Sequence, residues 1–293
     1  MQIINTQSPE SQALLGQIVD NTLPLSYSSI KRLLDSPYRF FEHKLTPPTE
    51  TNPLMLGKLF DEVILANEHT KDRILIAPKD ANGNELNGNT KAFQQLKEQA
   101  AAANKLLVRE ADYQDAEIIY NRLKMGIGRS IIINALFDPT TQRKHAFTTT
   151  AHFKDIEGES FTIPLRGELD AYAPDYDMII DLKSSSRAKF YGYAREFEAL
   201  NYDLQGAVYA YAKFGAHQAS TGAYEFAHIL IDSNAGDFEL YEIPPHRKRH
   251  GYELFKAGIA IYREIQIKLQ IFGQELFEDY CKFQPNFNSK ILY

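Results

Sequence analysis

The sequence contains a single cysteine, Cys281, so no disulfide can form within the chain. Zinc or iron–sulfur sites with four cysteine ligands are excluded for the same reason. Long apolar stretches are also absent. No run of about 18 apolar residues occurs, and the opening MQIINTQSPESQ lacks the apolar centre of a secretion signal. We therefore expect a cytoplasmic protein that is not inserted in a membrane.

Positive charge is not in excess, because the formal net charge is -6 at pH 7. This disfavours a protein that coats nucleic acid through its overall field, but not an enzyme with local basic groups and metal-binding carboxylates. Motifs of other enzyme classes are missing too. The chain has no G-x-x-x-x-G-K-[ST] loop and no G-x-S-x-G. Of its eight histidines, His246 and His250 in HRKRH are four residues apart, but the H-E-x-x-H motif of zinc hydrolases is absent. An ATP motor and a zinc hydrolase are therefore disfavoured.

The composition, 44% hydrophobic and 24% charged, supplies enough apolar material for a sizeable core. The residue pattern changes from helical to strand-like near residue 144. Two short helices are predicted within 23–45, the first capped by Ser26 or Ser28 and the second starting at Ser36-Pro37. Further helices are predicted at 54–68, 90–103 and 110–125, whereas 129–137 fits a helix or a strand. Strands are predicted at 144–155, 160–172, 178–185, 223–233 and 237–244, with long helices at about 189–213 and 246–273.

We interpret residues 1–293 as one α/β domain, in which a mixed sheet flanked by helices (about 144–275) follows a helical N-terminal extension (about 20–140). Two neighbouring strands of this sheet carry acids where apolar residues are usual. If 174–177 form the turn, residue pairs across the hairpin sum to 351. Asp170 then lies opposite Asp181, and Glu168 lies opposite Lys183. Alternation places these four residues with Arg166 on one face, and leaves Leu169, Ala171, Met178, Ile180 and Leu182 on the other.

Like charges directly opposite each other destabilise a sheet, but a hard divalent cation such as Mg²⁺ reverses that sign. Two carboxylates and a backbone carbonyl are ligands that Mg²⁺ accepts, and Lys183 could hold or deprotonate a water beside the metal. The alternative is a solvated polar face with an ordinary Glu168–Lys183 pair.

Asp170 and the later Asp181-Leu182-Lys183 resemble the core of PD-(D/E)xK nucleases, which have a restriction-endonuclease-like fold. The stretches RGELDAY and IIDLKSS are most similar to RecB-type exonucleases, especially phage-type enzymes of the RecE (exonuclease VIII) kind. Gln205-Gly-Ala-Val-Tyr209 matches the family's Q-x-x-x-Y on one helix face. LSYSSIKRLLDSPYRFF resembles its S-x-S-x-L…P-x-x-F helices, and LGKLFDEVI resembles its G-x-x-x-H segment. The four motifs occur in the family's order over about residues 25–215.

The resemblance implies site residues in three groups. Asp61, Asp170, Asp181 and the carbonyl of Leu182 would bind Mg²⁺, for which Mn²⁺ could substitute. Lys183 would orient or activate the attacking water, and Gln205 and Tyr209 would position Lys183 or a DNA phosphate. Ser184, Ser185, Arg187 and Lys189 are candidate DNA contacts, and so is the basic run HRKRH at 246–250.

Some of these assignments have alternatives. Asp61 replaces the family's histidine and could be a solvent-facing helical residue beside Glu62. Tyr209 could be a core aromatic, and HRKRH a solvated face. Ser36-Pro37 stands where iron–sulfur members have Cys-Pro, so we expect no iron–sulfur cluster.

By this resemblance we expect a Mg²⁺-dependent exonuclease that degrades linear double-stranded DNA, with 5′→3′ polarity, in phage-type recombination or repair. A ring-shaped trimer or tetramer and a single-strand annealing protein as partner are further implications. An endonuclease or a repair or defence accessory nuclease on the same core is one alternative. A catalytically decayed DNA-binding protein is the other.

Overall fold

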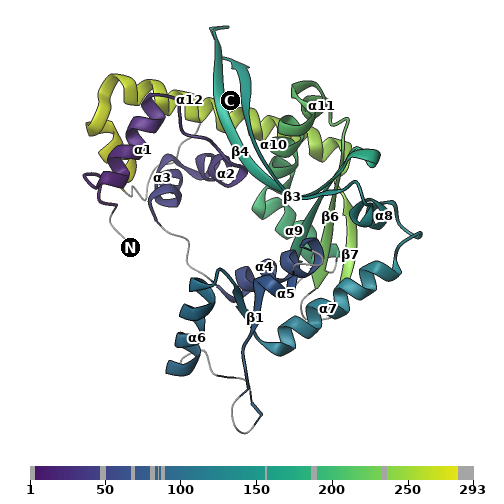
Figure 1. Cartoon of the computed structure of the whole chain (residues 1–293). Helices are drawn as coiled ribbons and strands as arrows, with labels where there is room; N and C mark the ends of the chain where they lie inside the picture. Colours follow the sequence, from purple (N-terminus) through teal and green to yellow (C-terminus); the bar gives the residue numbers. More distant parts are fainter. Residues whose placement is uncertain are drawn as a thin grey trace.

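The computed structural model describes residues 4–46, 51–66, 70–79, 83–84, 86, 90–155, 157–185, 190–232 and 236–282. At its centre is a five-stranded mixed sheet in the order β3-β4-β5-β6-β7 (Figure 1). Only β5 and β6 run parallel, and the other neighbouring strands are antiparallel. The strands are β3 (Gln142–Lys154), β4 (Ser160–Ala173), β5 (Met178–Ser185), β6 (Glu225–Asp232) and β7 (Asp237–Glu242). The predicted α/β class, a mixed sheet flanked by helices, is confirmed.

Helices cover both faces of this sheet, and β5 contributes to the core on each side. Ile179 packs in one hydrophobic cluster and Ile180 in the other, because successive side chains of a strand point to opposite faces. The first face is covered by α1 (Pro9–Val19), α2 (Tyr27–Asp35), α3 (Pro37–Leu45), α9 (Phe190–Leu200), α10 (Tyr202–Phe214), α11 (Ala216–Thr221) and α12 (Pro245–Cys281). The second face is covered by α4 (Asn52–Leu65), α7 (Glu110–Met125) and α8 (Ile131–Phe137).

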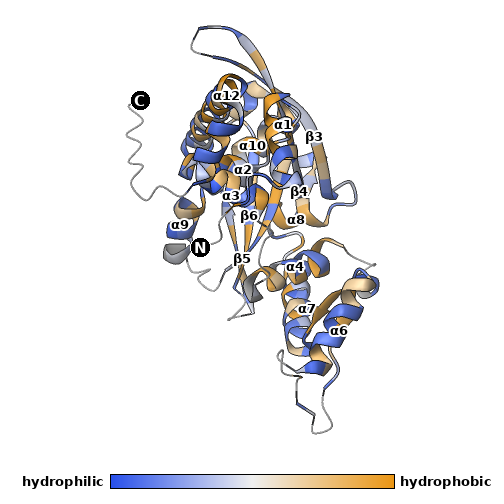
Figure 2. Ribbon diagram, turned by 90° about the vertical axis from the view of Figure 1, so that its left-hand side faces the viewer, coloured by the Kyte–Doolittle hydropathy of each residue, from blue (hydrophilic) through white to orange (hydrophobic). Residues whose placement is uncertain are grey.

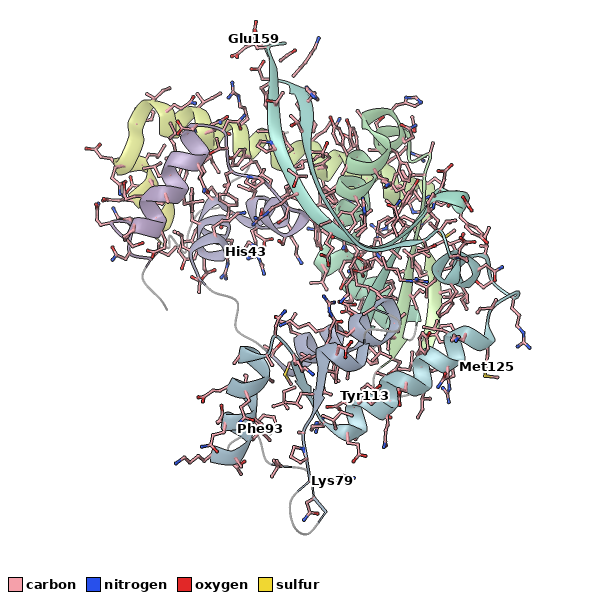
Figure 3. The ribbon with its side chains drawn as sticks, in the orientation of Figure 1. His43, Lys79, Phe93, Tyr113, Met125 and Glu159 are labelled. Atoms are coloured by element: carbon pink, nitrogen blue, oxygen red, sulfur yellow. The ribbon has the colours of Figure 1, made fainter. Side chains whose placement is uncertain are left out.

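Figure 2 shows hydrophobic residues gathering where the sheet meets these helices. A smaller unit lies beside α4 and consists of α5 (Thr70–Arg73), β1 (Ile74–Ile76), α6 (Lys91–Ala102) and β2 (Leu106–Val108). Its two strands pair in parallel. In Figure 3, Lys79 and Phe93 mark this region and Glu159 marks the tip of the β3–β4 hairpin. None of the described helices is long and apolar enough to cross a bilayer.

The register predicted for the β4–β5 hairpin is confirmed for the three pairs nearest the turn, but the ladder does not include the predicted Asp170–Asp181 and Glu168–Lys183 pairs. Ala171 pairs with Ile180 and Ala173 with Met178, so that each pair sums to 351. The turn is a 3₁₀ segment followed by Asp177 at φ 47°, a left-handed conformation that Asp adopts more readily than most residues. The ladder stops after Ala171–Ile180, one pair before Asp170 and Asp181.

The predicted apolar face is wrong at Leu169. Leu169 packs in the cluster under α10, whereas Ala171 packs in the cluster under α4. The alternation therefore breaks between these residues. On the adjacent strand β3, Lys144 has φ 49°, and it is skipped in a ladder that pairs Arg143 with Ala171 and His145 with Leu169. This local distortion lies directly beside Asp170.

The two helices predicted within 23–45 are α2 and α3, and each begins at a serine cap. The Ser26 side chain accepts a hydrogen bond from the backbone N–H of Ser29, and Ser36 does the same for Arg39, with Pro37 in the first turn of α3. The predicted helix at 189–213 is instead two helices, because Asn201 adopts φ 51° between α9 and α10. Within the ambiguous stretch 129–137, residues 131–137 are helical and form α8. The elements α1, α5, α11, β1 and β2 were not predicted from the sequence.

Candidate active site

Asp181 is a buried carboxylate in the middle of β5, with 2% of its surface exposed. Its Oδ1 accepts a hydrogen bond of 2.7 Å from Nε2 of Gln205 on α10. Its Oδ2 lies 2.5 Å from Nζ of Lys183, two residues further along the strand. A buried carboxylate without partners would be strongly destabilising, so the helix and the strand together make the ionised form tolerable.

Asp170 lies on β4 where that strand separates from β5. Its Oδ2 accepts a hydrogen bond of 2.7 Å from the backbone N–H of Leu182. The carboxylate thereby takes the place of the backbone carbonyl that a continued ladder would offer to this N–H. Asp170 and the Asp181–Leu182 segment are consequently joined by a side chain at the point where backbone pairing ends.

Asp61 reaches the same region from the other face of the sheet, on α4. This helix lies against the end of β5: a Cβ atom at Gly57 would be in ordinary contact, 3.4 Å, with Oγ of Ser184. Asp61 is partly buried, and its pKa is raised to about 7 by burial and by the charge of Asp181. Lys144 and Lys183 act in the opposite direction. The alternative of a freely solvated helical Asp is therefore not what the structure shows.

The charges of these residues are unbalanced. Burial and the charges of Asp181 and Asp61 raise the pKa of Asp170 well above its usual range, and burial also raises the pKa of Asp181. Burial lowers the pKa of Lys183, but Asp181, Tyr202 and Asp170 outweigh it and raise the pKa above that of an ordinary lysine. Lys183 faces three carboxylates, and the second lysine near Asp61, Lys144, is itself paired with Glu62. The site therefore has an excess of carboxylates whose charge a cation would balance.

The donor atoms suit a hard divalent cation in chemical type, since carboxylate and carbonyl oxygens are the ligands of Mg²⁺. Within the described ranges, however, no three Asp, Glu, His or Cys side chains stand close enough together to hold a metal ion as they are placed. The predicted ligands are Asp61, Asp170, Asp181 and the Leu182 carbonyl. Their oxygen atoms are of the type that Mg²⁺ binds, but the side chains would have to rotate to bring these oxygens around one ion.

Gln205 and Tyr209 lie one helical turn apart on α10, as the motif requires. Nε2 of Gln205 bridges Asp181 and the Tyr209 hydroxyl, which is 3.3 Å away. The Tyr209 ring is buried and meets the Phe147 ring edge-on at 5.8 Å. Gly167 makes room for this pair, because a Cβ atom there would lie 2.6 Å from the Phe147 ring. Tyr209 is thus a core aromatic whose hydroxyl also takes part in the site.

The predicted DNA contacts have different outcomes. Ser184 lies beside Gly57 at the edge of the site. The Ser185 hydroxyl donates to Glu196 at 2.6 Å and is buried, which makes it a poor phosphate contact. Arg187 and Lys189 fall outside the described residues.

The basic run at 246–250 is only partly a surface feature. Lys248 is buried, its Nζ donates to the Tyr224 carbonyl, and it lies 3.5 Å from Glu225. Arg247 pairs with Glu198. The interpretation of these two cations as contacts to the DNA backbone is therefore not supported, because their partners lie within the chain.

Three aromatic residues beside the site were missed at the sequence level. Nζ of Lys183 lies 4.6 Å from the ring centroid of Tyr202. His228 is fully buried on β6, with its Nε2 3.9 Å from Oδ2 of Asp181, and its Nδ1 shares a hydrogen bond with the Tyr193 hydroxyl. The signal was a histidine inside the apolar strand FAHILI, but its relevance depends on the parallel pairing of β5 with β6.

A family model described as a PDDEXK-like domain of unknown function (DUF3799) matches residues 26–231. This range includes Asp61, Asp170, Asp181, Lys183 and Gln205, and the observed mixed sheet is consistent with the restriction-endonuclease-like fold. No curated protein sequence matches the chain. A solved structure titled "Crystal structure of SSO0001" is similar at 12% identity over 86% of this chain and 87% of that chain. The TM-score of this match is 0.27.

Proposed function

Since this chain belongs to the PDDEXK-like family, we propose that it is a Mg²⁺-dependent nuclease that hydrolyses phosphodiester bonds of DNA, acting as an exonuclease on linear duplexes. One observation carries the proposal. The buried Asp181 is held by Gln205 and Lys183, and Asp170 and Asp61 lie close enough for the charge of Asp181 to raise their pKa. A buried excess of carboxylates beside a lysine is costly to maintain unless a cation is bound there.

Each residue has a role that follows from its contacts. A bound divalent cation would supply charge neutralisation at the phosphate and a more acidic water. Asp170 and Asp181, with Asp61, are the carboxylates that would hold it. Lys183 is charged at neutral pH, since its pKa is raised. It therefore acts as a cationic hydrogen-bond donor that orients the water or the phosphate, rather than as a free base.

Gln205 keeps the Asp181 carboxylate in one orientation through its 2.7 Å hydrogen bond, and the Tyr209 hydroxyl restrains Gln205 in turn. Both residues would act by positioning. The finer features of the proposal rest on the resemblance to RecE-like exonucleases. They are 5′→3′ polarity, a ring-shaped homo-oligomer, a role in phage-type recombination and a single-strand annealing protein as partner.

The test is digestion of linear duplex DNA labelled separately at each 5′ and 3′ end, with Mg²⁺, with Mn²⁺ and with EDTA. Lys183→Ala is the inactive variant, and Lys256→Ala is its matched control, because Lys256 is an exposed lysine paired with Glu253 on α12. Metal-dependent loss of label from one strand end, absent only in Lys183→Ala, is the expected result. A folded wild-type protein without activity in either metal contradicts the proposal.

Supercoiled plasmid separates the two nuclease modes. A strict exonuclease leaves closed circles intact, whereas linearised or nicked plasmid would show that the same core acts as an endonuclease. Light scattering during chromatography tests the proposed oligomer, because a trimer or tetramer has three or four times the 33.4 kDa mass of one chain.

A further inference from the structure

His228 stands beside the proposed metal-binding carboxylate without belonging to any motif of the family. It is the direct partner of Asp181 in the parallel β5–β6 ladder. Its side chain is fully buried, and its Nε2 lies 3.9 Å from Oδ2 of Asp181. That separation exceeds an ordinary N–H···O distance by about 1 Å. The two atoms therefore face each other at ion-pair distance, and the hydrogen bond between them would require the carboxylate to turn toward β6.

The imidazole ring has little freedom to turn. Four aromatic rings surround it at centroid distances of 5.3 to 5.9 Å. They belong to Tyr193, Phe197, Tyr202 and Phe226. An imidazole held in such a box keeps each nitrogen pointed in one direction, here Nδ1 toward Tyr193 and Nε2 toward Asp181.

The hydrogen bond to Tyr193 decides which nitrogen carries the proton. Burial raises the pKa of Tyr193, so its hydroxyl keeps a proton to donate. On the other side of the ring, Nε2 faces Oδ2 of Asp181, and a carboxylate oxygen accepts hydrogen bonds, so Nε2 is the nitrogen placed to donate. A neutral imidazole that accepts at Nδ1 must carry its hydrogen at Nε2.

Two buried polar atoms then face each other. Among the described residues, Nε2 of His228 has no hydrogen-bond partner, and Oδ2 of Asp181 has only its ion pair with Lys183. We propose that Tyr193 and His228 form a positioning pair: the Tyr193 hydroxyl fixes the imidazole so that its Nε2–H orients the Asp181 carboxylate. This inference rests on the proposed nuclease function, and it makes β6 and α9 part of the support for the site.

Substitutions of His228 separate positioning from simple packing. His228→Leu fills similar space without a donor, and we expect kcat and Mg²⁺ affinity to fall by about 10- to 100-fold, as for other groups that orient metal ligands. KM for duplex DNA should stay unchanged. His228→Gln restores an N–H donor, so we expect it to recover kcat to within a few-fold of the wild type.

Substitution of Tyr193 tests the first link of the pair. Tyr193→Phe should lower kcat by a few-fold, and should have no further effect in a His228→Leu background. Tyr262→Phe is the matched control. Tyr262 is also a fully buried tyrosine, and its hydroxyl has no hydrogen-bond partner in the part of the chain that the structure describes. Its loss should leave kcat unchanged.

A measurement without turnover decides the proton position. The ¹⁵N NMR shifts of the His228 ring in the metal-free wild type should show the Nε2–H tautomer, and Tyr193→Phe should weaken that preference. A wild-type Nδ1–H tautomer overturns the inference even if His228→Leu fails to fold. So does a folded, active wild type whose His228→Leu variant keeps normal kcat and Mg²⁺ affinity. An inactive wild type instead refutes the proposed function, while the tautomer and the calorimetric Mg²⁺ affinity of the variants still decide the positioning role.

Discussion

Two lysines, the partly buried Lys183 on β5 and the buried Lys248 at the start of α12, have superficially similar surroundings. Each has its ammonium group over a tyrosine ring, with Nζ 4.6 Å from the centroid of Tyr202 and 4.9 Å from that of Tyr224. Each also belongs to a stretch, IIDLKSS or HRKRH, that the sequence offered as functional. The chemical environments nevertheless differ.

Lys248 donates to the Tyr224 carbonyl, and its nearest carboxylate, Glu225, is exposed. The charge of Lys248 is therefore balanced by a backbone carbonyl and by an acid that solvent screens, so this lysine has a structural role. Lys183 instead meets Asp181, whose carboxylate is buried, with Asp170 and Asp61 adding further negative charge. Burial of a lysine alone therefore does not identify a site, whereas a buried surplus of carboxylates around it does.

The largest expected difference is the loss of each lysine. Lys183→Met should lower kcat by about 10²- to 10⁴-fold, because it removes a charged donor from the reacting phosphate or water. Lys248→Met should leave kcat within a few-fold and lower the free energy of unfolding by about 1–3 kcal/mol, since the Tyr224 carbonyl loses its donor. Steady-state kinetics and urea unfolding measure both. Equal losses of kcat in the two variants would contradict the proposed difference in role between Lys183 and Lys248.

The second-largest expected effect is the stabilisation of the folded protein by Mg²⁺. We expect Mg²⁺ at 100 times its dissociation constant to raise the free energy of unfolding of the wild type by about 2.7 kcal/mol. Asp170→Asn should abolish this gain because it removes a proposed ligand beside Leu182. Asp175→Asn, at an exposed position in the hairpin turn, is the matched control and should keep it. A Mg²⁺ response that survives Asp170→Asn would argue against a metal site here.

The pH dependence of the metal-free protein should reveal Asp61. Its pKa is about 7 when folded, whereas an unfolded Asp titrates near pH 4. Between these values the folded protein keeps a proton that the unfolded chain has released, so the free energy of unfolding falls as the pH rises. Asp61→Asn should remove about 2–4 kcal/mol of this decline.

Urea unfolding in EDTA at pH 5 and pH 8 measures the Asp61 effect as the difference between variant and wild type. Relative to the wild type, the free energy of unfolding of Asp61→Asn should be higher at pH 8 than at pH 5. Mg²⁺ should shrink that advantage, because a bound cation favours the ionised carboxylate. A difference that does not change with pH would mean that Asp61 titrates as an ordinary surface residue.

The smallest expected effect concerns the two tyrosine rings. Tyr202→Leu removes a cation–π contact worth about 0.5–2 kcal/mol and should lower kcat by less than about 30-fold, while Tyr202→Phe keeps the ring and most of the activity. Tyr224→Leu removes the corresponding ring near Lys248 and should affect only thermal stability. A loss of kcat in Tyr224→Leu that matches Tyr202→Leu would show that the two regions do not differ in function.

Predictions at the sequence level succeeded where one short stretch contained all the information. The four-residue turn set the hairpin register, and Ser36-Pro37 marked the start of α3. They failed where a neighbour in space changes the geometry. Leu169 changes sides beside the distortion at Lys144, and Asn201 divides one expected helix into two. Near both residues, the local pattern of apolar residues is the same as in a regular strand or helix, so the sequence does not reveal either change.

The residues of the candidate site also fall into a group that the local sequence identifies and a group that only the fold brings together. Local order along the chain was enough to single out Asp170, Asp181 and Lys183, because alternation in a hairpin and a three-residue motif are short-range properties. Only the folded chain brings Asp61 and Gln205 to these residues from opposite faces of the sheet, and places His228 beside Asp181 through a parallel crossover. Burial then makes the collected carboxylates costly, because few solvent dipoles remain to stabilise their charge, and no stretch of sequence expresses that cost by itself.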